Sequence, residues 1–285
     1  MDLPARLPPL RAVGSPAFHW RKRGPHRKIV HLGTQRRRNL RVPRARIGTK
    51  EGTMTIGKRW KQAQAAEKDF WSGLSAPTVQ QILDMNESSA KVLKSWVSEF
   101  PSPAVEIGVG GFGVGLLGFV PSIPFRIGVD PLPLVNPSCE PELLHKIMSL
   151  RASLHFIRSS GEAMPFRDAH FGLAVSVNVL DHVNNAPQVV GEIFRILRPG
   201  GLFFLGVDTF SYLGLAKWYL WTKPRHANEI LVLAHPYRFL ERHVETMCRA
   251  AGFEKVRNAA RGPVELCFGH SILSPFLFRK PLSAG

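Results

Sequence analysis

The sequence predicts an α/β fold built on a doubly wound, mostly parallel sheet of seven strands. Short, strongly apolar segments recur along the chain, among them 104–107, which is followed by glycine, 125–130, which ends in an acid, and 173–179. Near-continuous apolarity is typical of parallel strands that are covered on both faces. An amphipathic helical pattern at 186–197 lies between two such segments. Strands that alternate with helices favour a parallel sheet.

The remaining elements follow from periodicity and from turn residues. Apolar residues at three- and four-residue steps predict helices over 56–71 and 76–100, with a break at 86–89. These N-terminal helices are expected to form a lid. A further helix is expected over 235–251, where Gly252 ends it. The other strands are expected at 154–157, 202–207, 253–258 and 266–278.

Composition is that of an ordinary globular protein, with 44% hydrophobic residues in 285. No run of 18 apolar residues lacks charges, so no transmembrane segment is expected. The three cysteines lie far apart, which indicates reduced thiols and a cytoplasmic protein. The histidines show no metal-ligand spacing, so the sequence predicts no metal site.

Positive charge is concentrated at the N-terminus. Residues 1–53 carry +12 of the formal charge of +17, which leaves +5 for residues 54–285. Because the body is only mildly basic, a nucleic-acid partner is not expected for it. We divide the chain into a disordered basic tail (1–53), the N-terminal helices (54–100) and one large domain (101–285) with an insert at 208–235.

The Pro-, Gly- and Arg-rich tail has three interpretations. It is a basic arm for nucleic acid, an organellar targeting peptide, or a stretch that is not translated. For the last, Lys50-Glu51-Gly52 stands just before Met54, and those codons can resemble a bacterial ribosome-binding site. We therefore hypothesise a start at Met54, which intact mass of the native protein would test.

The segment 104–113 is predicted to bind a nucleotide-like ligand. A buried strand there runs into glycines at 108, 110, 111 and 113, which let the backbone turn tightly and approach a ligand. A second strand ends at Asp130, 20 residues after Gly110. An acid at this place in such folds accepts hydrogen bonds from ribose hydroxyls.

Four segments in order resemble the class I S-adenosylmethionine-dependent methyltransferases of the methyltransferase domain 11 type, which have a Rossmann-like fold. They are Val-Glu-Ile-Gly-Val-Gly-Gly-Phe-Gly (105–113), Gly-Val-Asp-Pro-Leu (128–132), Gly-Glu-Ala-Met-Pro-Phe-Arg-Asp-Ala-His-Phe (161–171) with Asn-Val-Leu-Asp-His-Val (178–183), and Ile-Leu-Arg-Pro-Gly-Gly (196–201). The resemblance covers roughly residues 104–253. It implies S-adenosyl-L-methionine as cofactor and methyl transfer as activity.

The resemblance also implies which residues meet the cofactor. The cofactor-binding set is Glu106, Gly108, Gly110, Gly113, Asp130, Ser160, Gly161, Glu162, Asn178 and Val179. Glu106, Gly108 and Gly110 are expected at the methionine end, Asp130 at the ribose, residues 160–162 at the adenine, and Asn178 and Val179 at the sulfonium. Ser160 departs from the pattern, since many relatives carry Asp there, and Glu162 is the substitute we consider.

Other classes of protein remain open at this point. Gly108-x-Gly110-x-x-Gly113 also matches the nicotinamide dinucleotide fingerprint, but the acid at Glu106 and the later segments favour a methyltransferase. An RNA methyltransferase would need a basic face on the body. A non-catalytic cofactor-binding protein is the third alternative.

The acceptor is expected to be a small molecule, with glycan or secondary-metabolite chemistry suggested by analogy alone. Asp181, His182 and His235 are the candidate bases, and Asp208 is a further acceptor-facing candidate. The N-terminal helices and the aromatic-rich insert 208–235 are expected to build the acceptor pocket. Trp60 and Trp71 are interpreted either as packing residues or as a cover for the ligand. The insert also suits contact with a membrane surface.

Overall fold

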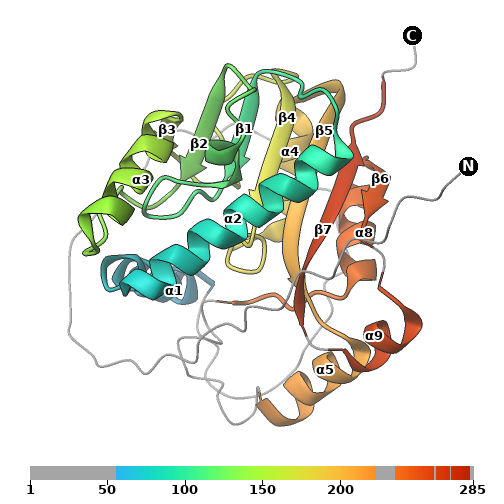
Figure 1. The fold of residues 1–285 in the computed structure, drawn as a ribbon. Coiled ribbons are helices and arrows are strands. Elements are labelled where there is room, and N and C mark those ends of the chain that lie inside the picture. Colours follow the sequence, from blue (N-terminus) through green and yellow to red (C-terminus); the bar gives the residue numbers. More distant parts are fainter. Residues whose placement is uncertain (1–55, 223–234, 260, 270, 283–285) are drawn as a thin grey trace, which may run out of the picture.

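The computed structural model describes residues 56–222, 235–259, 261–269 and 271–282. The expected tail lies outside these residues, as does most of the second half of the expected insert. Within them the chain forms one seven-stranded sheet with helices on both faces (Figure 1). In chain order the elements are α1 (Ile56–Ser72), α2 (Ala76–Trp96), β1 (Ala104–Ile107), η1 (Leu116–Phe119), β2 (Arg126–Asp130), α3 (Pro141–Ala152), β3 (His155–Arg158), β4 (Phe171–Val177), α4 (Ala186–Ile196), β5 (Leu197–Thr209), α5 (Tyr212–Lys217), η2 (Trp218–Thr222), α8 (Glu241–Ala250), β6 (Glu254–Asn258), α9 (Pro263–Phe268) and β7 (Ile272–Arg279).

The strand order is β3-β2-β1-β4-β5-β7-β6. The first five strands pair in parallel, whereas β7 pairs antiparallel with both β5 and β6. This confirms the predicted doubly wound, mostly parallel sheet. The dinucleotide-binding fold has six parallel strands, so the antiparallel β7 beside β5 distinguishes this sheet from that fold. Strand order reverses between β1 and β4, and ligands of open α/β sheets bind at such a point.

An apolar layer covers each face of the sheet. On one face α2 and η1 pack through Leu93, Leu116 and Leu117 against β4 and its neighbours. Figure 1 shows α2 crossing the front of the sheet. On the other face α4 and α8 pack through residues such as Val189 and Val244. From Leu173 to Val175, successive side chains of β4 alternate between these layers, as the pleat requires. Burial of all seven residues of β4 explains its continuous apolar sequence.

Several expected boundaries are wrong, each for a local reason. The expected break at 86–89 is absent: α2 continues through these residues, with Asn86 and Ser89 buried, and Asn86 Nδ2 donates to the carbonyl of Ile82 (3.1 Å). The helix expected over 235–251 begins at Glu241. Residues 266–268 close the short helix α9 instead of opening a strand, because Pro263 begins that helix and Glu265 Oε2 accepts from the Gly262 amide (2.9 Å). Helix α3, between β2 and β3, was not predicted.

Candidate active site

A cavity of about 480 Å³ lies where the strand order reverses. Helices α1 and α2 form one wall, and the residues that follow β1, β2 and β4 form the other. This volume is in the usual range for small-molecule and cofactor sites. Of the predicted cofactor-binding residues, those that line it are Gly108, Gly110, Asp130, Gly161, Glu162, Asn178 and Val179. Glu106, Gly113 and Ser160 do not line it.

The turn after β1 depends on glycine. Gly108, Gly110 and Gly113 have φ of +83°, +67° and +66°. These values lie in the left-handed region that side chains disfavour. A Cβ at Gly108 would also lie 2.2 Å from the side chain of Val179, which follows β4. The ends of β1 and β4 therefore lie so close together that no side chain fits at position 108.

Asp130, the last residue of β2, links this turn to β2 through hydrogen bonds. Its Oδ2 accepts from the Gly110 amide (2.8 Å) and its Oδ1 from the Leu132 amide (2.9 Å). Burial raises the pKa of Asp130 to about 6, although the two backbone hydrogen bonds oppose the shift. Each carboxylate oxygen keeps a further lone pair, so hydrogen bonds from ligand hydroxyls remain chemically available.

Glu106 has a different place from the one the resemblance implies. Both its oxygens accept short backbone bonds, Oε1 from Leu116 and Oε2 from Leu117, each 2.7 Å long. These bonds hold the start of η1, and a Cβ at Gly115 would lie 2.2 Å from the carboxylate. Burial raises the pKa of Glu106 to about 7 despite both hydrogen bonds. The side chain therefore shapes the segment after the glycine turn and has no cavity-lining surface.

Glu162 connects the loop after β3 to the loop before α4. Its Oε1 accepts from the amides of Asn184 (3.0 Å) and Asn185 (3.2 Å), and its Oε2 accepts from the Ser160 hydroxyl. The carboxylate that we considered as a substitute for the usual Asp thus has structural partners, while the residue still borders the cavity. Ser160 contributes to the site through Glu162.

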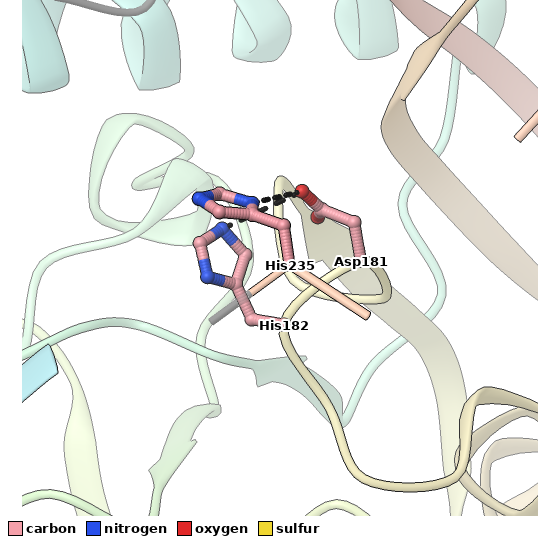
Figure 2. A group of neighbouring side chains, drawn as sticks. All are labelled: Asp181, His182 and His235. Carbon is pink, nitrogen blue, oxygen red and sulfur yellow. Dashed lines mark hydrogen bonds and ion pairs between the residues drawn. The ribbon is translucent and has the colours of Figure 1, made fainter. Parts of the chain in front are cut away.

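The candidate bases Asp181, His182 and His235 come together in the structure (Figure 2). Asp181 and His182 follow β4, and His235 comes from the other end of the expected insert. His235 Nδ1 lies 2.9 Å from Asp181 Oδ2, and His182 Nε2 lies 3.6 Å from the same oxygen. The two imidazole rings lie with centroids 4.0 Å apart. Both histidines line the cavity, as does Asp208.

Glu67 is a member of this group that sequence reasoning missed. It lies on α1, and its Oε1 is 2.8 Å from His182 Nδ1, although 115 residues separate the two. No local pattern links residues so far apart, so only the packing of α1 over the site reveals the contact. The same helix places Trp60 and Trp71 in the cavity wall. A Cβ at Gly110 would lie 2.4 Å from the Trp71 ring, which therefore packs directly on the glycine turn.

The surroundings shift the pKa values of the two histidines in opposite directions. Burial disfavours charge on His182, but the carboxylates of Asp181 and Glu67 outweigh it and raise its pKa to about 9. Burial and the neighbouring His182 lower the pKa of His235. Burial also raises the pKa of Asp208 to about 6, and the Asp181 carboxylate adds to this shift.

The insert contributes less to the cavity than we expected. Within its described part only Asp208 and His235 line the cavity, one at each end. Trp218 instead packs under the Arg238 guanidinium, whose carbon lies 4.1 Å from the ring centroid. The side chain of Trp221 lies outside the described residues.

Residues 125–205, from β2 into β5, match the family model of the methyltransferase domain. The matched segment is similar to a methyltransferase domain, and together with the fold it bears out the expected resemblance to methyltransferases of this type. The chain is similar to an uncharacterized methyltransferase of Mycobacterium leprae, 30% identical over 152 residues, or 52% of this chain and 49% of the relative. One from Mycobacterium tuberculosis is 27% identical over 169 residues, or 56% and 59%.

The chain thus spans about half the length of the curated relatives it matches. Among solved structures, the fold resembles that of the 1,6-didemethyltoxoflavin-N1-methyltransferase of Burkholderia thailandensis. The TM-score is 0.54 and the identity 14%, with 82% of this chain and 93% of that chain covered. No described helix is both long and apolar enough to cross a membrane.

Proposed function

We propose that this protein transfers a methyl group from S-adenosylmethionine to a small-molecule acceptor. The observation that carries the proposal is that one cavity joins the glycine turn, Asp130 and the imidazoles of His182 and His235. A cofactor fits this cavity because Gly108 and Gly110 present bare backbone and Asp130 presents carboxylate oxygens.

The proposed placement of the cofactor follows the order of these residues. The backbone of Gly108 and Gly110 would hold the amino-acid part, Asp130 the ribose hydroxyls, and Gly161 with Glu162 the adenine. Asn178 and Val179 would border the sulfonium. When bound, S-adenosylmethionine supplies an electrophilic methyl group. The solved relative from Burkholderia thailandensis contains S-adenosylhomocysteine, which supports a cofactor of this kind.

The protein's own contribution is to position the acceptor and to keep water out. Helices α1 and α2 cover the cavity with Trp60, Trp71, Ile82 and Met85. This apolar wall suits an apolar or ring-bearing acceptor, and the relative from Burkholderia thailandensis contains such a ring compound, 1,6-didemethyltoxoflavin. We infer that the reacting atom of the acceptor lies beside His182 and His235.

Calorimetry with S-adenosylhomocysteine tests the cofactor half. The wild-type chain should bind it and should not bind NAD. Replacing Asp130 by Asn removes a charged acceptor and should weaken binding by about 10- to 100-fold, because a hydrogen bond to a charged group contributes about 1.5–3 kcal/mol. Asp69→Asn on the exposed side of α1 is the control and should bind normally. Binding of NAD in place of S-adenosylhomocysteine would overturn the proposal.

Turnover tests the acceptor half. Metabolite extracts and RNA are incubated separately with labelled S-adenosylmethionine, and label should enter a small molecule. The acceptor so identified is then used with His182→Ala and His235→Ala. We expect at least one variant to lose turnover while cofactor affinity stays intact. If both retain full turnover, the acceptor does not react beside them.

A further inference from the structure

Asp181, His182 and His235 form a compact set of metal-ligand groups. One ligand atom from each lies within 4.8 Å of the other two. Sequence spacing gives no sign of it, because His235 stands 54 residues after Asp181. We propose that these three side chains bind one divalent first-row transition-metal ion such as Zn²⁺. Two imidazoles and one carboxylate are a ligand set that suits such ions better than Mg²⁺ or Ca²⁺.

The separations between ligand atoms fit a metal centre. With metal–ligand bonds of about 2.0–2.1 Å, ligand atoms in a tetrahedral site lie about 3.3 Å apart. Asp181 Oδ2 is 2.9 Å from His235 Nδ1 and 3.6 Å from His182 Nε2, which bracket that value. In Figure 2 both rings face the Asp181 carboxylate. An ion there would replace the hydrogen between His235 and Asp181, and His235 would carry its proton on Nε2.

Glu67 supplies the outer support that metal-bound histidines need. Its Oε1 lies 2.8 Å from His182 Nδ1, so this nitrogen donates to the carboxylate and Nε2 is left for the ion. A carboxylate that orients a histidine in this way fixes the ring and raises its basicity as a ligand. Glu67 and Asp181 also provide two negative charges beside one dication.

Asp181 provides an independent sign. The residue is 6% exposed, and its Oδ1 accepts no hydrogen bond from any other described residue. A buried carboxylate oxygen without a donor is costly, and a cation bound through both oxygens of the Asp181 carboxylate would satisfy it. The Arg238 guanidinium does not donate to this oxygen; its Nη1 donates instead to the carbonyls of His235 (2.7 Å) and Tyr237 (2.8 Å).

The position of the cluster gives the ion a role. Both imidazoles line the cavity, whereas Asp181 does not, so the open coordination positions would face the acceptor. A metal ion in such a site binds and orients an oxygen of the substrate. The acceptor class is therefore one with a hydroxyl or carbonyl oxygen at the reacting end. This role rests on the proposed function, but metal binding itself can be measured without any turnover.

The test uses the full chain, stripped of metal with a chelator and titrated with Co²⁺. We expect visible Co²⁺ absorption that saturates at one equivalent, is displaced by Zn²⁺ and is unaffected by excess Mg²⁺. Asp181→Asn and His235→Ala should each weaken Co²⁺ binding by at least about tenfold, and Glu67→Gln should weaken it by about 10- to 100-fold. His155→Ala, on the exposed edge of β3, should bind as the wild type does.

Circular dichroism and S-adenosylhomocysteine affinity, measured on the same samples, separate loss of the site from loss of fold. The proposal is overturned if the wild-type chain takes up no Co²⁺. It is also overturned if Asp181→Asn and His235→Ala, when folded, bind Co²⁺ as tightly as the wild type. A chain that binds S-adenosylhomocysteine but no Co²⁺ defeats this proposal alone. A chain that binds Co²⁺ but no S-adenosylhomocysteine defeats the proposed function.

Discussion

Glu106 shows how a residue expected at the ligand acts through the backbone instead. Its two oxygens satisfy the amides of Leu116 and Leu117. A Gln side chain at this position has one oxygen that can accept from one of these amides. Its NH₂ group would face the other amide, which would lose its acceptor. We expect Glu106→Gln to lower the free energy of unfolding by about 1–3 kcal/mol, the usual cost of an unsatisfied buried group. Urea unfolding measures this, with the exposed Glu99→Gln as control. Equal stability of the Glu106 and Glu99 variants would contradict it.

The same carboxyl should give stability a specific pH dependence. Its pKa is raised from 4.5 to about 7 by burial, so the folded state favours the neutral acid more than the unfolded state does. Its contribution is therefore complete below pH 4.5 and is lost as the pH rises through 7. The stability advantage of the wild type over Glu106→Gln should shrink between those values. Urea midpoints of both proteins at intermediate pH measure this, and an advantage that grows with pH would refute it.

At the scale of elements, the glycine turn and helix α1 are packed against each other. Gly110 has φ +67°, and a Cβ there would meet the Trp71 ring at 2.4 Å. Gly110→Ala should therefore displace α1 and weaken S-adenosylhomocysteine binding by at least about tenfold, which is 1.4 kcal/mol. Gly191 in α4 has open space around its Cβ position. Gly191→Ala should leave binding unchanged and raise stability by about 0.5–1 kcal/mol.

The double variant Gly110→Ala/Trp71→Ala separates two causes of that loss. If the Trp71 ring is the obstacle, removing it should restore part of the affinity, whereas backbone strain at position 110 would remain. Calorimetry and thermal unfolding of the wild type, Gly110→Ala, Trp71→Ala and the double variant measure both effects. Unchanged affinity in Gly110→Ala would show that the turn tolerates a side chain and that α1 is not tightly seated.

The sequence predicts an element well where the burial of its residues leaves a clear apolar pattern. The strand at 104–107 was predicted with its observed bounds, because all four residues are buried and glycine follows. Helix α3 was missed because only Ile147 among its residues is buried, which leaves a weak periodic pattern. The pairs Glu67–His182 and Asp181–His235 follow from packing between distant segments. The residues of the candidate active site are therefore partly predictable, but their partners are not.

In the whole molecule, most of the positive charge precedes the described helices and strands. Residues 1–53 carry +12, whereas the described elements and the cavity residues all lie at residue 56 or later. A chain that starts at Met54 should therefore keep its S-adenosylhomocysteine affinity within about twofold and its thermal midpoint. It should lose most of its affinity for polyanions, because binding through Lys and Arg depends on counterion release and falls steeply with salt.

Heparin chromatography and RNA titrations at two salt concentrations compare the full chain with the shortened one. We expect the shortened chain to elute at lower salt and to bind RNA weakly and without sequence preference. RNA binding that is unchanged after the deletion would place a basic face on the body, since only +5 remains to produce it. That result would favour RNA as the methyl acceptor and would count against the small molecule proposed above.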